Sequence, residues 1–129
     1  MFYTDTSAAM MLVVAESDSR ELQLWIERVA IELFSSDLLR TELVKAVRRS
    51  APSREKRAHE VLDTILLVEI PTSVFDRAAT VEPPSLRSLD AVHLAAAMDV
   101  GDALKGIVTY DDRLSEAASA IGIPVIEPH

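Results

Sequence analysis

The fold is decided by a stretch near the C-terminal end, LRSLDAVHLAAAMDVGDALKGIVTYDDRLSEAASAIGIPVI (Leu86–Ile126). Its first part is apolar and predicts a helix over 86–100 that Gly101 closes. A short apolar run over 106–110 predicts a strand. The other predicted elements here are a helix over 112–121 and a strand over 123–126. Helices that alternate with strands indicate a mostly parallel sheet with helices on both faces, an α/β fold.

The N-terminal part shows the same alternation. The first residues, MFYT, predict a short buried strand that stops at Asp5. In the helix predicted over 20–30, Leu22, Trp25 and Ile26 share one apolar face, which favours packing on the core over a docking role. The other predicted elements are helices over 7–15, 38–50 and 52–66 and near 73–76, and strands over 32–35 and 67–70. No repeat or linker divides the chain, so we expect one domain over 1–129.

Composition excludes several kinds of site. The 129 residues include no cysteine, which rules out thiolate catalysis, cysteine-based zinc sites and a disulfide scaffold. The three glycines do not form a dinucleotide-binding fingerprint or a P-loop. The longest purely apolar run, Ala8–Ala15, is shorter than the ~20 residues that cross a bilayer, and no basic residue precedes it. We therefore expect a cytoplasmic protein without a membrane partner.

The net charge of −8 is unevenly distributed along the chain. An acidic protein repels phosphate at long range, which argues against a simple electrostatic DNA binder. The segment 40–57, however, holds seven basic residues and only two acidic ones. It is either a solvated helix end, where cations are favoured, or a nucleic-acid contact. The candidates for such a contact are Arg40, Lys45, Arg48 and Arg49.

Two acids stand at the carboxyl ends of predicted strands, where parallel sheets bind their ligands. Asp5 ends the first strand, and Asp111 ends the strand over 106–110. Each acid has an alternative role, because an aspartate in this position commonly caps the helix that follows. Position alone leaves both roles open.

Two further acids lie on predicted helices. Asp90 lies on the helix quoted above, which is apolar nearly all round and is expected to be buried. An ionised carboxylate there is costly unless a cation or hydrogen-bond donors meet it, and Arg87 and His93 are candidate structural partners. Glu42 also has apolar helical neighbours, but Lys45 at i+3 offers an ordinary surface ion pair.

The four acids together favour a hard cation. Carboxylate clusters without cysteine suit Mg²⁺ or Mn²⁺, which take oxygen ligands. Such an ion orients a phosphodiester and activates water. It would also explain the acidic net charge, because the metal joins an acidic pocket to a polyanion. The candidate metal ligands are Asp5, Glu42, Asp90 and Asp111.

Four segments occur in an ordered series along nearly the whole chain. They are FYTDTSA (Phe2–Ala8), SSDLLRTEL (Ser35–Leu43), RSLDAVHLAAA (Arg87–Ala97) and VTYDDRL (Val108–Leu114). Together they resemble the motifs of PIN-domain ribonucleases, especially the VapC toxins of bacterial toxin–antitoxin pairs. The resemblance implies a PIN-like three-layer α/β/α sandwich with a mostly parallel central sheet.

The same resemblance implies the toxin of a type II toxin–antitoxin system, a Mg²⁺- or Mn²⁺-dependent endoribonuclease. By position, it assigns catalytic and metal-binding roles to Asp5, Glu42, Asp90 and Asp111. It implies an RNA substrate, a VapB-type antitoxin and a homodimer, with DNA contacted only indirectly through the antitoxin.

Supporting roles follow from the same motifs. Ser7 or Thr6, together with Thr109, would supply hydrogen bonds to the acids. The chain departs from the family at Asp111–Asp112, where the family commonly has one acid. The T-x-D spacing from Thr109 selects Asp111, which leaves Asp112 as a helix-start acid or an auxiliary ligand.

Two other functions remain open from the sequence. A receiver-like domain is also doubly wound and uses an acidic Mg²⁺ pocket to accept phosphate on an aspartate. It would require paired acids after the first strand and a late lysine, whereas here Asp5 is single and Arg113 follows the paired acids. A catalytically silent PIN-like binding module is the second alternative.

Overall fold

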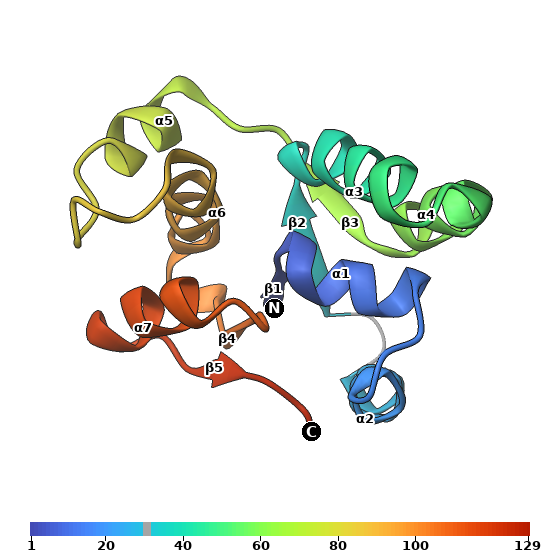
Figure 1. Ribbon diagram of the computed structural model, residues 1–129. Coiled ribbons are helices and arrows are strands. Elements are labelled where there is room, and N and C mark those ends of the chain that lie inside the picture. The colour runs from blue at the N-terminus through green and yellow to red at the C-terminus, as the bar shows by residue number, and fades with distance from the viewer. Residues whose placement is uncertain (30–31) are drawn as a thin grey trace.

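The computed structural model describes residues 1–29 and 32–129, and within them a five-stranded sheet forms the centre (Figure 1). The strands are β1 (Phe2–Thr4), β2 (Leu33–Ser36), β3 (Leu66–Val68), β4 (Gly106–Val108) and β5 (Val125–Ile126). All neighbouring strands are parallel, in the order β3-β2-β1-β4-β5. The predicted parallel sheet is confirmed.

The strand order excludes the receiver-like interpretation. Receiver domains follow the order 2-1-3-4-5, in which the third strand lies beside the first. In this protein β4 lies beside β1, and β2 and β3 extend from the other side of β1. The direction of the chain across the sheet therefore reverses between β1 and β4. Ligands of open parallel sheets bind outside the carboxyl ends of the strands at such a reversal.

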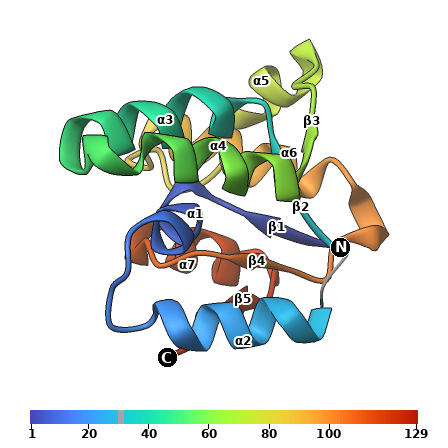
Figure 2. The same cartoon turned by 90° about the vertical axis from the view of Figure 1, so that its right-hand side faces the viewer.

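Helices cover both faces of the sheet (Figure 2). They are α1 (Thr6–Val13), α2 (Ser19–Val29), α3 (Leu38–Ser50), α4 (Glu55–Thr64), α5 (Thr72–Ala78), α6 (Ser88–Met98) and α7 (Asp112–Ala120). These bounds agree with the predicted elements to within a few residues. The last position of the helix predicted over 20–30 lies outside the described residues. None of the helices in the described ranges is long and apolar enough to cross a membrane.

Two boundaries differ from the sequence prediction for local reasons. The helix expected from Pro52 begins with a 3-10 turn over Pro52–Arg54 before α4. The helix expected over 86–100 ends at Met98, and Gly101 starts a further 3-10 turn with a positive φ of 60°. A glycine adopts this backbone conformation without the steric penalty that other residues have.

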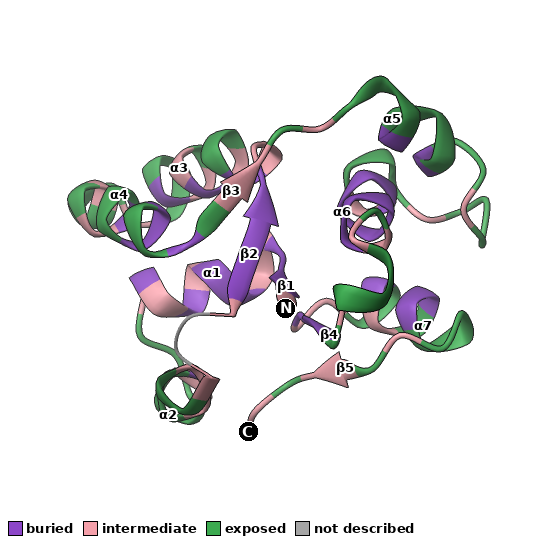
Figure 3. Cartoon of the chain, turned by 180° about the vertical axis from the view of Figure 1, so that it is seen from behind, coloured by how far each residue is buried: buried purple, intermediate pink, exposed green. Residues whose placement is uncertain are grey.

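Side chains alternate between the two faces of the sheet along each strand, so the core consists of two clusters. Tyr3, Phe34 and Ile107 point to one face and pack against α5, α6 and α7. Leu33 and Val108 point to the other face and pack with α1, α3 and α4. The inner sides of these helices are buried, as Figure 3 shows. This arrangement is the three-layer sandwich that the resemblance implied.

The apolar faces of α6 and α2 are used in the core. Every residue of α6 from Ala91 to Ala97 is buried, as the apolar sequence predicts. On α2, Leu22 is fully buried, and Trp25 packs edge-on against Phe2 with ring centroids 4.9 Å apart. The interpretation of this face of α2 as core packing is therefore confirmed.

Part of the basic segment 40–57 has a structural role. Arg54 Nε donates to the carbonyl of Val13 at 3.0 Å, and Arg57 Nε donates to the carbonyl of Leu12 at 3.2 Å. Both acceptors lie at the C-terminal end of α1, where carbonyl groups lack partners inside the helix. These two arginines therefore connect the 3-10 turn and α4 to the C-terminal end of α1.

Replacing Arg54 tests this role. Arg54→Ala is expected to lower the free energy of unfolding by about 1–2 kcal/mol, because a partly buried carbonyl loses its charged donor. Lys56→Ala is the matched control, since Lys56 is exposed, and its effect should stay within about 0.5 kcal/mol. Urea denaturation of both variants measures the difference, and equal losses would contradict the assignment.

Candidate active site

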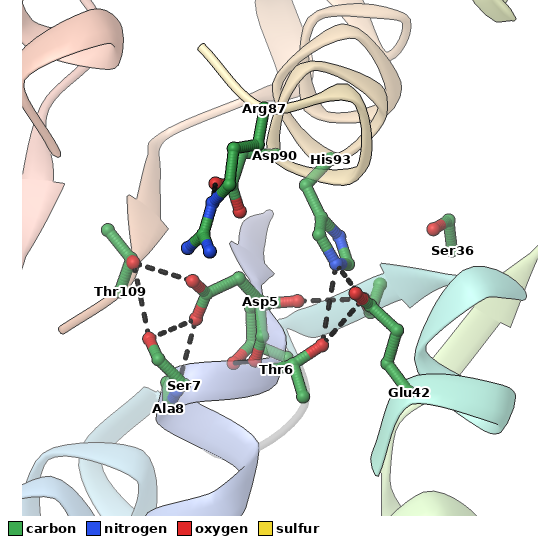
Figure 4. A network of polar contacts seen from close by, with 12 residues as sticks. Asp5, Thr6, Ser7, Ala8, Ser36, Glu42, Arg87, Asp90, His93 and Thr109 are labelled. Atoms are coloured by element: carbon green, nitrogen blue, oxygen red, sulfur yellow. Dashed lines mark hydrogen bonds and ion pairs between the residues drawn. The ribbon is translucent and has the colours of Figure 1, made fainter. Parts of the chain in front are cut away.

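The candidate acids come from four segments of the chain. Figure 4 shows Asp5, Glu42 and Asp90 around one region, and Asp111 is joined to it through Thr109, whose hydroxyl accepts from Asp111 N and donates to Asp5. Asp5 directly follows β1, and Asp111 follows β4 within three residues. Asp90 lies in the first turn of α6, and Glu42 lies on α3. The sequence thus places acids at the carboxyl edge from segments far apart in the chain.

Asp5 is fixed by three donors. Its Oδ1 accepts hydrogen bonds from Ala8 N at 3.0 Å and from Ser7 Oγ at 2.7 Å. Its Oδ2 accepts one from Thr109 Oγ1 at 2.6 Å. Burial raises the pKa of Asp5, and the hydrogen bonds from Thr109, Ala8 and Ser7 oppose that shift. Asp5 therefore caps α1 and also presents a carboxylate in the site, so its two predicted roles are compatible.

Thr109 and Ser7 connect the ends of β1 and β4. Thr109 Oγ1 donates to Asp5 and accepts a hydrogen bond from Asp111 N at 3.0 Å. Ser7 Oγ donates to Asp5 and accepts from Tyr110 N at 2.9 Å. The two hydroxyl groups hold the segment 109–111 against the start of α1. This is the support that the motifs predicted for both residues.

The two adjacent acids at the start of α7 differ in their surroundings. Asp111 Oδ1 accepts from Leu114 N at 3.0 Å and so caps α7. Asp112 is exposed and is the first residue of α7, where the helix dipole favours an acidic side chain. Within the described residues, Asp112 forms no hydrogen bond with the candidate acids. This favours the helix-start role for Asp112.

Glu42 is held by a chain of hydrogen-bonded groups. Sequence reasoning named Thr6 as a donor to the acids but did not connect His93 or Tyr3 with Glu42. Thr6 Oγ1 donates to Glu42 Oε1 at 2.7 Å, and His93 Nε2 lies 2.5 Å from the same oxygen. The other ring nitrogen of His93 shares a hydrogen bond of 2.7 Å with the hydroxyl of Tyr3. The Tyr3 hydroxyl lies 3.0 Å from Ser36 Oγ. The chain runs from the buried sheet to the pocket and sets the orientation of Glu42.

The surroundings of Glu42 favour its ionised form. Burial alone would raise its pKa, but the hydrogen bond and the charge of His93, with the hydrogen bond from Thr6, hold the pKa of Glu42 below its usual value. The expected ion pair with Lys45 does not form in the described structure, because Lys45 is exposed and Glu42 turns to His93. His93, which the sequence analysis named as a candidate partner of Asp90, forms its hydrogen bonds with Glu42 and Tyr3. Its position on the buried helix α6 was the available sequence signal for an internal contact.

Asp90 has a carboxylate oxygen without a hydrogen bond. Its Oδ2 is buried and forms no hydrogen bond in the described structure, and its ion-pair partner is the guanidinium of Arg87 at 3.5 Å. Burial raises the pKa of Asp90, the charge of Asp111 raises it further, and Arg87 and His93 oppose the shift. One guanidinium, that of Arg87, contacts an oxygen of each acid. The carboxylates of Asp90 and Asp111 therefore lie close together and face a common space.

The donor set fits a hard divalent cation held by a pair of carboxylates. Mg²⁺ in proteins is commonly bound by one or two carboxylates while it keeps several water ligands. Asp90 and Asp111 would form such a pair, and Asp90 Oδ2, which has no hydrogen bond in the described structure, would supply a ligand atom. The described residues contain no group of three or more metal-ligating acids or histidines gathered round one point. Asp5 and Glu42 accordingly lie beside the pair.

The basic candidates for a nucleic-acid contact fall into two classes. Arg40 and Arg48 each form an ion pair with a neighbouring acid, at 2.8 and 3.2 Å. Lys45 and Arg49 are exposed and form no ion pair within the described part of the chain. With Glu42 they occupy positions i, i+3 and i+7 of α3, and therefore one side of that helix. These two cations are free to contact an anion beside the candidate site.

Comparison with known proteins gives matches along nearly the whole chain. The family model described as PIN domain matches residues 2–120. A relative from Mycobacterium tuberculosis, named Ribonuclease VapC35, is 37% identical over 131 aligned positions, which cover 99% of this chain and 97% of the relative. Identity at this level over the full length places both chains in one family.

Solved structures show the same fold. The crystal structure of Mycobacterium tuberculosis VapC20, described as a sarcin–ricin loop cleaving toxin, aligns with a TM-score of 0.78 and 13% identity, covering 99% of this chain and 100% of that one. A toxin–antitoxin complex from Klebsiella pneumoniae aligns with a TM-score of 0.75 and 21% identity, covering 100% and 98%. At these identities the likeness concerns the fold alone.

Proposed function

Since the chain belongs to the PIN domain family and to its VapC group, we propose that it is the toxin of a type II toxin–antitoxin pair and a divalent-metal-dependent endoribonuclease. The observation that carries the proposal is the pair of carboxylates of Asp90 and Asp111 at the reversal between β1 and β4, where Asp90 Oδ2 is buried without a hydrogen bond and lies 3.5 Å from the guanidinium of Arg87. Buried carboxylates are costly unless cations meet them, and one arginine supplies a single positive charge for the two acids. A divalent cation at this pair would offset both charges.

The four acids have different roles in the proposed hydrolysis. A Mg²⁺ or Mn²⁺ ion at the site would activate water for attack on phosphorus and stabilise the charge on the leaving oxygen. Asp90 and Asp111 hold that cation, and Asp5 adds its negative charge from a fixed position beside them. Glu42, ionised and oriented by His93, binds metal or orients the attacking water. The hydrogen bonds preorganise these groups, so little reorganisation is needed during the reaction.

The substrate backbone extends along α3 in this proposal. Lys45 and Arg49 follow Glu42 on one side of the helix and have no acidic partner in the described structure. Cations in that position attract phosphate groups on either side of the scissile bond. Arg40 and Arg48, which are paired with acids, contribute less.

The partners follow from the same assignment. The similar structures include a toxin–antitoxin complex from Klebsiella pneumoniae and FitAB bound to a DNA fragment. We infer that this chain likewise binds a small VapB-type antitoxin and forms a homodimer. DNA would be contacted indirectly, through the antitoxin. The acidic charge of the protein suits a partner that presents a basic side chain to the pocket.

Cleavage of RNA tests the proposed function. Protein purified free of antitoxin is incubated with total RNA in Mg²⁺, in Mn²⁺ or in EDTA, and the ends of the products are mapped. We expect cuts at discrete sites in either metal and none in EDTA, because the acids need a cation to act on a polyanion. Cleavage that persists in EDTA would contradict the metal requirement. Absence of cleavage by folded, metal-loaded protein would favour the silent binding module.

A further inference from the structure

A solvent-facing guanidinium reaches into the acidic pocket. Arg87 immediately precedes α6, and its side chain is 70% exposed, whereas those of Asp90 and Asp111 are 17% and 24% exposed. Its Nε lies 3.5 Å from Asp90 Oδ2, and its Nη2 lies 3.8 Å from Asp111 Oδ2. Figure 4 shows the guanidinium turned toward Asp5. Arg87 thus offsets part of the charge of the same two carboxylates that fit a cation.

The guanidinium of Arg87 is held loosely, whereas the carboxylate of Asp111 is held firmly. Both of its contacts lie near the outer limit of an ion pair, and Asp90 Oδ2 still has no hydrogen bond in the described structure. Asp111 is fixed because its Oδ1 caps α7. Ion pairs that involve a solvent-exposed side chain contribute little to stability. Arg87 is therefore the member of this group that can move at little cost.

A second cation at the two acids would displace Arg87. Like charges repel, so the guanidinium and a divalent cation compete for the same carboxylate oxygens. The displaced side chain stays at the edge of a hollow of about 300 Å³. The residues that line this hollow are Glu42, Arg87, Ser88, Leu89 and Asp90. There its five donors, in a planar fork, match the oxygens of a phosphate group.

We propose that Arg87 is an exchangeable counterion of the site. It pairs with Asp90 and Asp111 in the metal-free protein, and it binds a phosphate of the RNA backbone when a divalent cation occupies the acids. The inference rests on the proposed ribonuclease function and adds to it a residue that reduces the negative charge of the pocket before the cation binds and then positions the substrate.

The proposed counterion role is tested by the affinity of the protein for Mn²⁺ alone. This affinity is measured without RNA, by calorimetry or electron paramagnetic resonance. Arg87→Ala is expected to bind Mn²⁺ about 2- to 10-fold more tightly than the wild type, because a competing cation is removed. Arg87→Lys, which keeps the charge, should remain near the wild type. Arg113→Ala is the control, because Arg113 is exposed near Asp111 and forms no ion pair with it in the described structure. Unchanged or weaker Mn²⁺ binding by Arg87→Ala would overturn the counterion role.

The proposed contact of Arg87 with a phosphate of the RNA is tested by RNA cleavage at saturating Mn²⁺. The kcat/KM of Arg87→Ala should fall about 10- to 100-fold, because a charge-assisted contact with phosphate is lost. Tighter metal binding with weaker cleavage is a combination that a merely distorted site would not produce. An unchanged kcat/KM would overturn the phosphate role. If the wild type with bound Mn²⁺ cleaves no RNA, the proposed function fails instead, and the Mn²⁺ affinities still decide the counterion role.

Discussion

Asp90→Asn is expected to keep the fold and to lose RNA cleavage by about 100-fold or more. The asparagine retains the size of the side chain but removes one of the two charges that face the common space. A metal ion stabilises the charge of the transition state by several kcal/mol, and every 1.36 kcal/mol corresponds to about tenfold in rate. Initial rates of RNA cleavage in Mg²⁺, with near-ultraviolet circular dichroism to verify the fold, measure the effect.

The stability of the same variant supplies an independent check. Because burial and the charge of Asp111 raise the pKa of Asp90, the folded state binds a proton there more readily than the unfolded state. The stability from that proton is present below the unfolded pKa and is lost as the pH rises through the folded pKa. The metal-free variant should therefore unfold at the same or a higher temperature than the wild type at pH 7.

The difference in melting temperature should narrow as the pH is lowered toward 3.8, the ordinary value for an aspartate. There the wild-type carboxyl is itself protonated, so it resembles the asparagine in charge. Cleavage at the wild-type rate by folded Asp90→Asn would remove Asp90 from the metal site. A strongly lowered melting temperature at pH 7 would mean that the Asp90 carboxylate stabilises the metal-free fold.

Leu94→Ala is expected to have the largest effect on stability, about 2–5 kcal/mol less free energy of unfolding. Leu94 is fully buried in α6, on the side that packs against the sheet and the neighbouring helices. Its loss would leave a cavity in the helix that carries Asp90 and His93. Urea denaturation followed by far-ultraviolet circular dichroism gives the free energy directly.

Leu89→Ala is the matched control on the same helix, because the Leu89 side chain is 50% exposed. Its effect on stability should remain within about 0.5 kcal/mol. Equal losses for Leu89 and Leu94 would contradict the burial of α6 that the structure shows. The comparison separates helix propensity from packing, since both changes are leucine to alanine within one helix.

The sequence predicted the acids better than it predicted their partners. Asp5 and Asp111 were recognisable because a strand ends before each of them, and both also cap the helices that follow. Asp90 was recognisable because it is charged within an apolar helix. These signals are local, and local patterns follow from the periodicity of a helix or a strand. The close approach of Asp90 to Asp111 was not readable in this way.

The partners of Glu42 depend on contacts between distant segments. His93 is 51 positions away from Glu42 along the chain, and 90 positions separate it from Tyr3. Lys45 was the nearest partner by helical spacing, but α3 turns Glu42 toward α6 and leaves Lys45 exposed. Such pairings are set by the order of strands in the sheet.

The sequence by itself determined the alternation of strands and helices, the apolar faces and the positions of the acids, because each depends on short-range spacing. Only the tertiary structure decided that β4 lies beside β1, which excludes a receiver-like sheet and brings Asp5 near Asp111. It also assigned Arg54 to the end of α1 and brought Asp111 to Arg87, whose pairing with Asp90 the helical spacing had predicted correctly. The physical reason is that a charged side chain pairs with whatever group the packed helices bring within reach, and packing is a property of the whole chain.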